Sequence, residues 1–396
     1  MQSDTPISDR GQGWFRYFPG DRPEDYRWSA AFALILGTTH WGGSTLSEVH
    51  QVGERLADKV GDDEAWFAEW RRAGDKVRAL ADQEDGAGHR LTAAEAYLRA
   101  CCYYQMGERF RLPKDDVALS VYRDSVDCFK RYIDRIDGAR IEPVEVPFEG
   151  GVLPAYFVDA ANTDSSPGPA MVFFDGLDIS KELQFCLGVN ELSRRGIKCL
   201  IVDGPGNGES IRFKDLPLRY DYDVAGTAAY EYLAARPDVA PDRIGVMAIS
   251  LGGYYAPRCA SKEPRFAACV AWGAIWDYHA TWKRRVDAAY QTSLSVAGDH
   301  IAWVLGVETV DEALKALEPF THEGVVGDLR CSLLITHGEG DAQIPVEDAR
   351  RLYEAVGTTD KTLRVFTREE GGAQHCQIDY SIRGVSFIAD WLQSNL

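Results

Sequence analysis

The sequence lacks a long hydrophobic run, a surplus of basic residues and any regular spacing of cysteines. No apolar run approaches the roughly 20 residues that a membrane-spanning helix needs, so we expect no membrane partner of that kind. The chain has 43 basic and 61 acidic residues, which gives a formal net charge of −18. Nucleic acids and anionic membranes bind through basic patches, so this charge argues against both as partners.

Cysteine occurs nine times, an odd number, without the pairs that bind metal or carry out redox chemistry. No Cys-x-x-Cys pattern and no cysteine–histidine cluster with zinc spacing occurs, so we expect neither a metal nor a cofactor. Most cysteines lie in apolar segments, as Cys199 and Cys269 do, which is typical of buried free thiols in a reducing compartment. The polar segment 1–13 lacks the apolar core of a signal peptide, and we therefore expect a cytoplasmic protein.

The N-terminal third of the chain has the periodicity of helices. The 396 residues suffice for one domain of about 250 residues and a second of about 140. Apolar residues recur at helical spacing from Tyr26 to Ile136, with predicted helices that begin near Asp62, Thr92 and Asp115. No repeat is regular enough for a solenoid, so we expect packed helical hairpins. The first aromatic residues could pack these helices, line a pocket or mediate dimerisation, and we favour packing: Trp14, Phe15, Tyr17, Phe18, Tyr26 and Trp28.

From Ile141 the pattern changes to that of strands. Apolar residues alternate on both sides of Gly150 and Gly151, which predicts a β-hairpin. After a polar loop at 162–169, strand and helix patterns take turns, which favours an α/β fold with a doubly wound, mostly parallel sheet. The predicted strands are 170–174, 198–202, 243–248, 267–272, 333–336 and 362–366, and the predicted helices are 181–194, 224–235, 346–356 and 380–392.

One strand leads into a turn that is typical of a serine nucleophile. Ile244 and Val246 predict the strand, and Ser250 follows it directly before a helical segment. The turn is tight, so it needs small residues two positions on either side of the serine, and Ala248 and Gly252 meet this need. Ala248 stands where glycine is more usual, and it adds one methyl group at this tight turn.

A serine nucleophile needs a base, and the base needs an acid that orients it. In the chain order serine, acid, histidine, the acid follows a late strand and the histidine lies in the last loop. Asp341 and His375 occupy these positions, and Glu339 is the closest rival for the acid. His337, beside the acid, is interpreted as structural, and His279 is a weak pocket candidate. The other histidines are expected to have surface or core roles: His40, His50, His89, His300 and His322.

The oxyanion that forms when serine attacks a carbonyl needs two backbone N–H donors. The N–H of Leu251 should be one, because this residue follows the nucleophile. The other should come from the loop after the strand 170–174, from either Gly176 or Leu177. The glycine-rich segment 203–208 lacks the lysine and the spacing of nucleotide-binding loops, so we interpret it as a tight turn beside the active site, tied to other loops by Asp203.

These segments resemble the α/β-hydrolase superfamily, and within it the 2,6-dihydroxypseudooxynicotine hydrolase group. The strings that carry the resemblance are Gly-Leu-Asp-Ile-Ser-Lys-Glu at 176–182, Ser-Leu-Gly-Gly at 250–253, Trp-Gly at 272–273 and His-Gly-x-x-Asp at 337–341. The resemblance implies an α/β-hydrolase fold and the triad Ser250, Asp341 and His375. It also implies that an N-terminal helical domain caps the active site and helps to build a pocket for a bulky, often aromatic substrate.

We therefore expect a helical cap domain over residues 1–140 and a catalytic domain over 141–396, with a helical insertion at about 276–330 above the carboxyl edge of the sheet. The expected function is serine hydrolysis of a bulky, aromatic or polyketide-like carbonyl compound. Members of the group cleave a carbon–carbon bond next to a ketone, and we slightly favour this reaction. The alternatives are an esterase, lactonase or acyltransferase, and, more remotely, a non-catalytic helical scaffold. The expected partner is a small-molecule substrate, and the helical faces are compatible with a homodimer.

Overall fold

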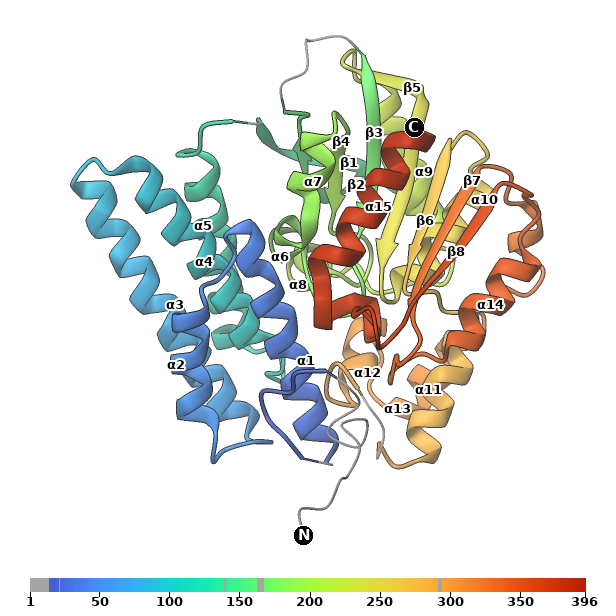
Figure 1. Ribbon diagram of the computed structural model, residues 1–396. Coiled ribbons are helices and arrows are strands. Elements are labelled where there is room, and N and C mark those ends of the chain that lie inside the picture. The colour runs from blue at the N-terminus through green and yellow to red at the C-terminus, as the bar shows by residue number, and fades with distance from the viewer. Residues whose placement is uncertain (1–13, 21, 139, 162–166, 291–293) are drawn as a thin grey trace.

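Five α-helices form the described N-terminal part of the protein in the computed structural model (Figure 1). The structure describes residues 14–20, 22–138, 140–161, 167–290 and 294–396, so segment 1–13 and most of the loop predicted at 162–169 lie outside it. The helices are α1 (Pro23–Gly37), α2 (Leu46–Leu56), α3 (Asp63–Gly86), α4 (Arg90–Glu108) and α5 (Asp116–Ile133). Acidic caps begin two of them, because Asp62 accepts a hydrogen bond from the N–H of Ala65 at 2.9 Å and Asp115 accepts one from Ala118 at 2.9 Å.

From residue 141 on, the described residues include eight strands that form one mostly parallel sheet. The strands are β1 (Ile141–Phe148), β2 (Gly151–Val158), β3 (Gly168–Phe174), β4 (Lys198–Val202), β5 (Val239–Ile249), β6 (Ala268–Trp272), β7 (Ser332–Gly338) and β8 (Lys361–Phe366). Their order is β1-β2-β4-β3-β5-β6-β7-β8, with antiparallel pairing at β1–β2 and β2–β4 and parallel pairing at every other junction. This arrangement confirms the α/β fold that the alternating patterns predicted.

Helices cover both faces of the sheet, as a doubly wound fold requires (Figure 1). They are α6 (Lys181–Gln184), α7 (Asn190–Arg194), α8 (Gly208–Phe213), α9 (Asp223–Ala234), α10 (Gly252–Lys262), α14 (Val346–Ala355) and α15 (Ser381–Asn395). Between β6 and β7 the chain forms α11 (Tyr278–Asp287), α12 (His300–Leu305) and α13 (Val310–Leu317). These three helices lie within the segment 276–330, for which the sequence predicted a helical insertion.

The single helix predicted over 181–194 is broken in the structure. A π-turn, η4 (Phe185–Val189), separates α6 from α7, and Gly188 has a φ of +98°. A Cβ atom at this position would lie 2.2 Å from a methyl carbon of Val385 in α15. The close packing of α15 thus requires a glycine, and the left-handed conformation of Gly188 ends the regular helix.

The helical region does not close its core on itself. One cluster of buried side chains runs from Trp28, Trp66 and Trp70 in the N-terminal helices to Met171 and Phe173 on one face of the sheet. A second cluster fills the opposite face, beneath α9, α10 and α14. Because the first core is shared, the helices are held against the sheet by buried apolar surface rather than by a flexible linker.

The nine cysteines are free thiols, and eight of them are buried. Of the early aromatic residues, Phe18, Tyr26 and Trp28 are buried, whereas Phe15 is exposed. No helix among the described residues is long and apolar enough to cross a membrane.

Candidate active site

Ser250 lies at the turn between β5 and α10. Its φ of 61° is in the left-handed region, where a side chain costs energy. The turn leaves no space for larger neighbours, because a Cβ atom on Gly252 would lie 2.3 Å from the Cβ of Ala248. The backbone N–H of Ser250 donates to the carbonyl of Trp272 in β6 at 2.8 Å, which fixes the turn to the sheet edge.

Two hydrogen bonds connect Ser250, His375 and Asp341. The Oγ of Ser250 lies 2.8 Å from Nε2 of His375, and Nδ1 of His375 lies 2.7 Å from Oδ2 of Asp341. A carboxylate can only accept, so in the neutral imidazole Nδ1 carries the proton and Nε2 is free to accept from the serine hydroxyl. The other Asp341 oxygen accepts the N–H groups of Gln343 and Ile344, at 2.8 and 3.0 Å, which holds the carboxylate in place.

The rival residues do not join this chain of hydrogen bonds. Glu339 accepts the N–H of Arg368 at 2.7 Å. His337 lies in hydrogen-bond reach of the Ile344 carbonyl, at 3.0 Å from Nε2, and its Nε2 lies 3.5 Å from Oδ2 of Asp341, so it packs against the acid. His279 is not among the residues that line the cavity around Ser250.

The buried environment changes the pKa of both partners. Burial lowers the pKa of His375, but the negative charge of Asp341 outweighs burial and raises this pKa well above the ordinary value of 6.5. Burial raises the pKa of Asp341, but the charge of His375 outweighs it and lowers that pKa below its usual value. The pair therefore favours a charged imidazole beside a charged carboxylate, which is the state that a base reaches after it takes a proton.

The predicted oxyanion donors lie next to Ser250. Leu251 follows it, and a Cβ atom on Gly176 would lie 2.9 Å from the Cβ of Ser250. Leu177 is the next residue of the same loop.

Side chains from the helical region and from the sheet enclose a small cavity at Ser250. It has a volume of about 50 Å³, whereas sites for drug-sized ligands have roughly 300–1,000 Å³. The sequence did not point to the residues that the helices contribute, which are Ala30 and Leu34 in α1 and Arg109 after α4. The other lining residues are Gly176, Asp178, Ile179, Ile249, Ser250, Ser295, Gln343, His375, Cys376 and Ile378.

Two polar contacts link the helical region to loops of the site. Arg109 donates to the Asp178 carboxylate at 2.6 Å and to its carbonyl at 3.3 Å. Gln343 donates to the hydroxyl of Tyr26 at 3.3 Å. Both pairs join residues that are far apart in the sequence, so no local pattern could have revealed them.

Comparison with known proteins assigns the chain to a family. A family model described as "Esterase FrsA-like" matches residues 46–371. The chain belongs to this family. It is 28% identical to the 20-hydroxy-prefusarin hydrolase FUS2 of Gibberella moniliformis, over 88% of this chain and 91% of that protein. It is 26% identical to the hydrolase acrC of Aspergillus aculeatus, over 92% of this chain and 94% of that protein.

Solved structures share the fold of this FrsA-like chain. The crystal structure of 2,6-dihydroxy-pseudo-oxynicotine hydrolase superposes with a TM-score of 0.75 at 24% identity, over 91% of this chain and 95% of that one. AbyA5 superposes with a TM-score of 0.63 at 20% identity, over 91% of this chain and 99% of that one. The resemblance found in the sequence is confirmed, and the protein is a hydrolase with the α/β-hydrolase fold and an N-terminal helical region.

A buried ionic cluster lies in the FrsA-like chain between the loops after β3 and β4. The Lys181 ammonium group lies 2.7 Å from carboxylate oxygens of Glu182, Asp203 and Glu209. Asp203 also accepts the N–H groups of Lys181 and Glu209, at 2.9 and 2.8 Å. Asp203 thus ties these loops together, as the sequence predicted. Burial lowers the pKa of Lys181, but the surrounding carboxylates outweigh it and raise this pKa well above its ordinary value.

Replacing Lys181 with Met is expected to destabilise the protein by about 3–5 kcal/mol, because the substitution leaves buried carboxylates without their cation. The free energy of unfolding, measured by urea denaturation, would report the change. Lys283→Met is the matched control, since this lysine forms an exposed ion pair with Asp287 and should change stability much less. Equal losses in the two variants would contradict the assigned role of the cluster.

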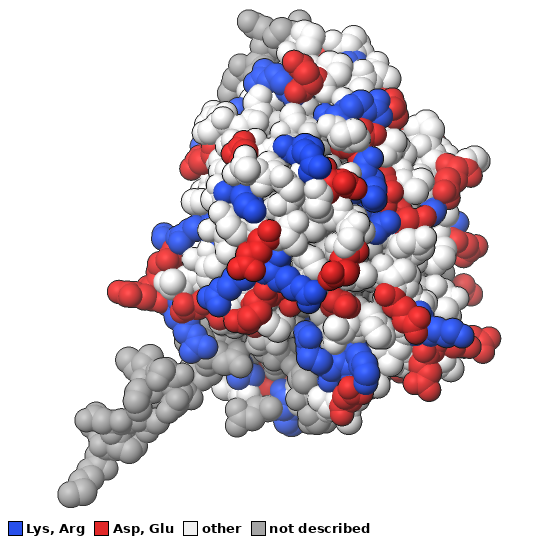
Figure 2. All heavy atoms as spheres, turned by 90° about the vertical axis from the view of Figure 1, so that its right-hand side faces the viewer, with Lys and Arg blue, Asp and Glu red and all other residues white. Residues whose placement is uncertain are grey.

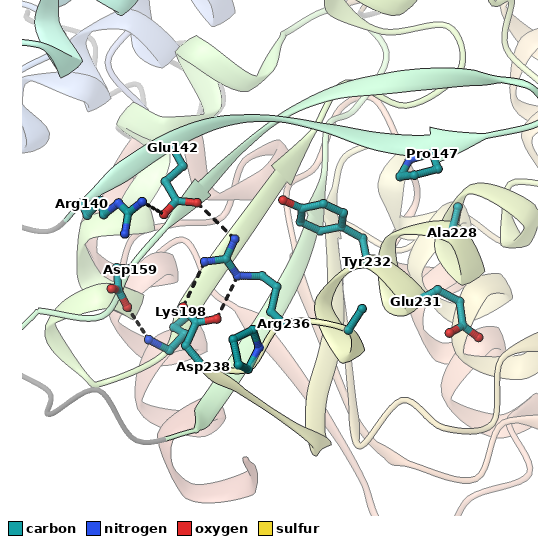
Figure 3. Close-up of a pocket in the computed structure, with 12 residues that line it drawn as sticks. Arg140, Glu142, Pro147, Asp159, Lys198, Ala228, Glu231, Tyr232, Arg236 and Asp238 are labelled. Carbon is teal, nitrogen blue, oxygen red and sulfur yellow. Dashed lines mark hydrogen bonds and ion pairs between the residues drawn. The ribbon is translucent and has the colours of Figure 1, made fainter.

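A larger cavity of about 1050 Å³ lies away from the catalytic residues (Figure 3). It includes Lys198 and Asp238, which lie at the amino ends of β4 and β5, whereas Ser250 follows the carboxyl end of β5. Its charges neutralise one another: Arg236 pairs with Asp238 at 3.0 Å and with Glu142 at 3.1 Å, and Lys198 pairs with Asp159. No unpaired group in it points to a ligand among the residues that the structure describes.

Acidic and basic side chains lie intermixed on the face shown in Figure 2, without a large area of one sign. Within the described ranges, no group of three or more histidine, cysteine or acidic residues has an arrangement that could hold a metal ion.

Proposed function

We propose that this FrsA-like protein is a serine hydrolase in which Ser250 is the nucleophile, His375 the base and Asp341 the acid that orients the base. The observation that supports the proposal is the continuous chain of hydrogen bonds, 2.8 Å from serine to imidazole and 2.7 Å from imidazole to carboxylate. The left-handed backbone of Ser250 adds support, since strain of this kind is typical of functional positions.

The reaction begins when Ser250 Oγ attacks a substrate carbonyl carbon and its proton passes to Nε2 of His375. Asp341 stabilises the imidazolium, and backbone N–H groups hold the negative oxygen. When the tetrahedral intermediate collapses, the bond to the leaving fragment breaks and that fragment takes the proton from His375. Water then attacks the acyl-serine, with His375 again as base, and releases an acid.

We propose a bulky, aromatic or polyketide-like carbonyl compound as the substrate, and we favour cleavage of a carbon–carbon bond next to a ketone. Such a leaving group departs as an enol, which the substrate itself must stabilise. Support comes from the apolar lining of the cavity and from the relative that is named a 20-hydroxy-prefusarin hydrolase. Ester hydrolysis is the second candidate, favoured by the esterase description of the family. Lactonase and acyltransferase activities belong to the same candidate, because only the leaving group or the final acceptor differs.

A panel of aryl esters and 1,3-diketones separates these reactions. The favoured proposal predicts that diketones are cleaved, with one equivalent of carboxylic acid formed for each bond broken. Rapid turnover of the esters with no diketone cleavage would exclude the carbon–carbon reaction and leave the esterase. No turnover in either series, together with no labelling by a fluorophosphonate, would favour a non-catalytic scaffold.

We further propose that residues 1–140 act as a cap domain over the catalytic domain 141–396. The supporting observation is that Ala30 and Leu34 of α1 line the same cavity as Ser250 and His375. The cavity of about 50 Å³ is too small for a bulky substrate, so the side chains that line it must rearrange when such a substrate binds, while the shared core keeps the helices on the sheet.

Shortening Leu34 to Ala should enlarge the acyl pocket. We expect the ratio of kcat/KM for p-nitrophenyl butyrate over acetate to rise by about fourfold for each extra methylene group that the pocket accepts. Leu36→Ala is the matched control, since Leu36 lies on the same helix but does not line the cavity. The same rise in both variants would mean that α1 does not define the pocket.

We also infer a cytoplasmic location from the nine free thiols, and a homodimer from the helical faces. Sedimentation velocity of the full chain would test the dimer.

A further inference from the structure

The loop 176–178 is held by side chains that the catalytic relay does not include. The amide nitrogen of Asn207, in the loop after β4, donates to the Gly176 carbonyl at 2.5 Å. The Tyr222 hydroxyl donates to the Asn207 side-chain oxygen at 3.3 Å, which fixes which end of the amide faces Gly176. Arg109 holds Asp178 two residues further on.

Tyr222 is itself held firmly. It is fully buried, and its ring stacks on that of Tyr255 with centroids 3.6 Å apart and planes 3° from parallel. A Cβ atom on Gly204 would lie 2.0 Å from the Tyr222 oxygen, so this glycine lets the phenol reach the loop. The stacked pair of Tyr222 and Tyr255 therefore holds the hydroxyl that donates to the side-chain amide of Asn207.

The orientation of the Gly176 carbonyl determines the direction of the next N–H. The peptide bond between Gly176 and Leu177 is trans, and in a planar trans peptide the C=O and N–H groups point in opposite directions. Because the Gly176 oxygen points to Asn207, the Leu177 N–H points away from it. In the described part of the chain this N–H has no protein acceptor.

The peptide between Asp175 and Gly176 has a different orientation from the peptide between Gly176 and Leu177. A Cβ atom on Gly252 would lie 3.4 Å from the carbonyl oxygen of Asp175, so this oxygen faces the start of α10. The N–H of Gly176, opposite it, therefore points away from the turn that carries Ser250 and Leu251. Neither N–H has a protein acceptor among the described residues, and the directions of the two peptides favour Leu177 over Gly176 as the donor.

We propose that Asn207, supported by Tyr222, is a positioning residue that turns the Gly176–Leu177 peptide so that the Leu177 N–H, together with that of Leu251, binds the oxyanion. This inference rests on the proposed function and adds to it the residues that set the second donor. Asn207 touches neither the substrate nor the reacting atoms. It acts before substrate arrives, by removing the freedom of this peptide to rotate.

A spectroscopic test needs no substitution. The sequence contains one Gly-Leu step, at 176–177, so protein labelled with ¹³C-carbonyl glycine and ¹⁵N-leucine gives one carbonyl-edited amide signal, that of Leu177. Phenylboronic acid, which forms a tetrahedral adduct with an activated serine, is the probe. We expect the Leu177 amide proton to move downfield when the adduct forms. An adduct that leaves this signal in place would overturn the inference alone, and no adduct on wild-type protein would overturn the proposed function with it.

Substitution tests the positioning role. Asn207→Ala should lower kcat for p-nitrophenyl acetate by about 10²-fold, the loss typical of one oxyanion donor, with KM little changed and weaker phenylboronic acid binding. Tyr222→Phe, which keeps the ring stack, should lower kcat less, and Tyr220→Phe, an exposed phenol, is its control. The amide signal of Leu177 should broaden or split in Asn207→Ala and in Tyr222→Phe. Folded variants with wild-type kcat and boronate affinity would overturn the proposal, and so would losses that appear in KM alone.

Discussion

Replacing Ser250 with Ala is expected to lower kcat for p-nitrophenyl acetate by on the order of 10⁶-fold. Alanine has no oxygen to attack the carbonyl, and the 2.8 Å hydrogen bond to His375 is lost. The fold should persist, since alanine is smaller than serine and the backbone bond from residue 250 to Trp272 remains. Both proteins are treated with a fluorophosphonate and the intact masses are then measured. We expect one adduct on the wild-type chain and none on the Ser250→Ala variant.

Ser295→Ala is the matched control for this prediction. Ser295 lines the same cavity but takes no part in the hydrogen-bond chain, so its loss should change kcat little. Labelling of the Ser250 variant at the wild-type rate would mean that another residue is the nucleophile.

Replacing Asp341 with Asn is expected to lower kcat by about 10⁴-fold. The asparagine oxygen can still accept the N–H groups of Gln343 and Ile344, so the turn is kept. Its NH₂ group would face Nδ1 of His375 and donate to it. That interaction places the proton on Nε2, and the imidazole can then no longer accept from Ser250.

The pH dependence should change in the same variant. In the wild-type protein the pKa of His375 is raised above 6.5, and the base must be neutral, so kcat/KM should rise with pH through a midpoint above 6.5. Without the Asp341 charge, the strongest influence that raises the pKa of the imidazole is lost while burial still lowers this pKa, so the midpoint should move to lower pH. Glu339→Gln is the control and should leave both kcat and the midpoint unchanged. A midpoint that stays in place in the Asp341 variant would show that another group titrates.

The sequence predicted the sheet and the three candidate catalytic residues for one reason. Ser250, Asp341 and His375 each follow a strand, and parallel strands place their carboxyl ends at the same edge of a sheet. The distances of 2.8 and 2.7 Å agree with that expectation of proximity, while the catalytic roles stay predictions that the variants above test. Local patterns also predicted the hairpin of β1 and β2.

Other features could not be predicted from local patterns. The break at Gly188 depends on Val385, almost 200 residues later in the chain, which packs where a regular helix would run. The cavity wall at Leu34 depends on how the helical region lies against the sheet. The choice between Gly176 and Leu177 as donor depends on the contact between the Gly176 carbonyl and Asn207.

By itself, the sequence determined the succession of strands and helices along the chain and the loops that carry the reactive side chains. The reason is that hydrophobic periodicity and turn chemistry act over a few neighbouring residues. Only the tertiary structure decided the shape of the cavity, the pKa of His375 and the direction of the peptide after Gly176. These properties arise from contacts and burial between segments that are distant in the chain, and no local pattern encodes them.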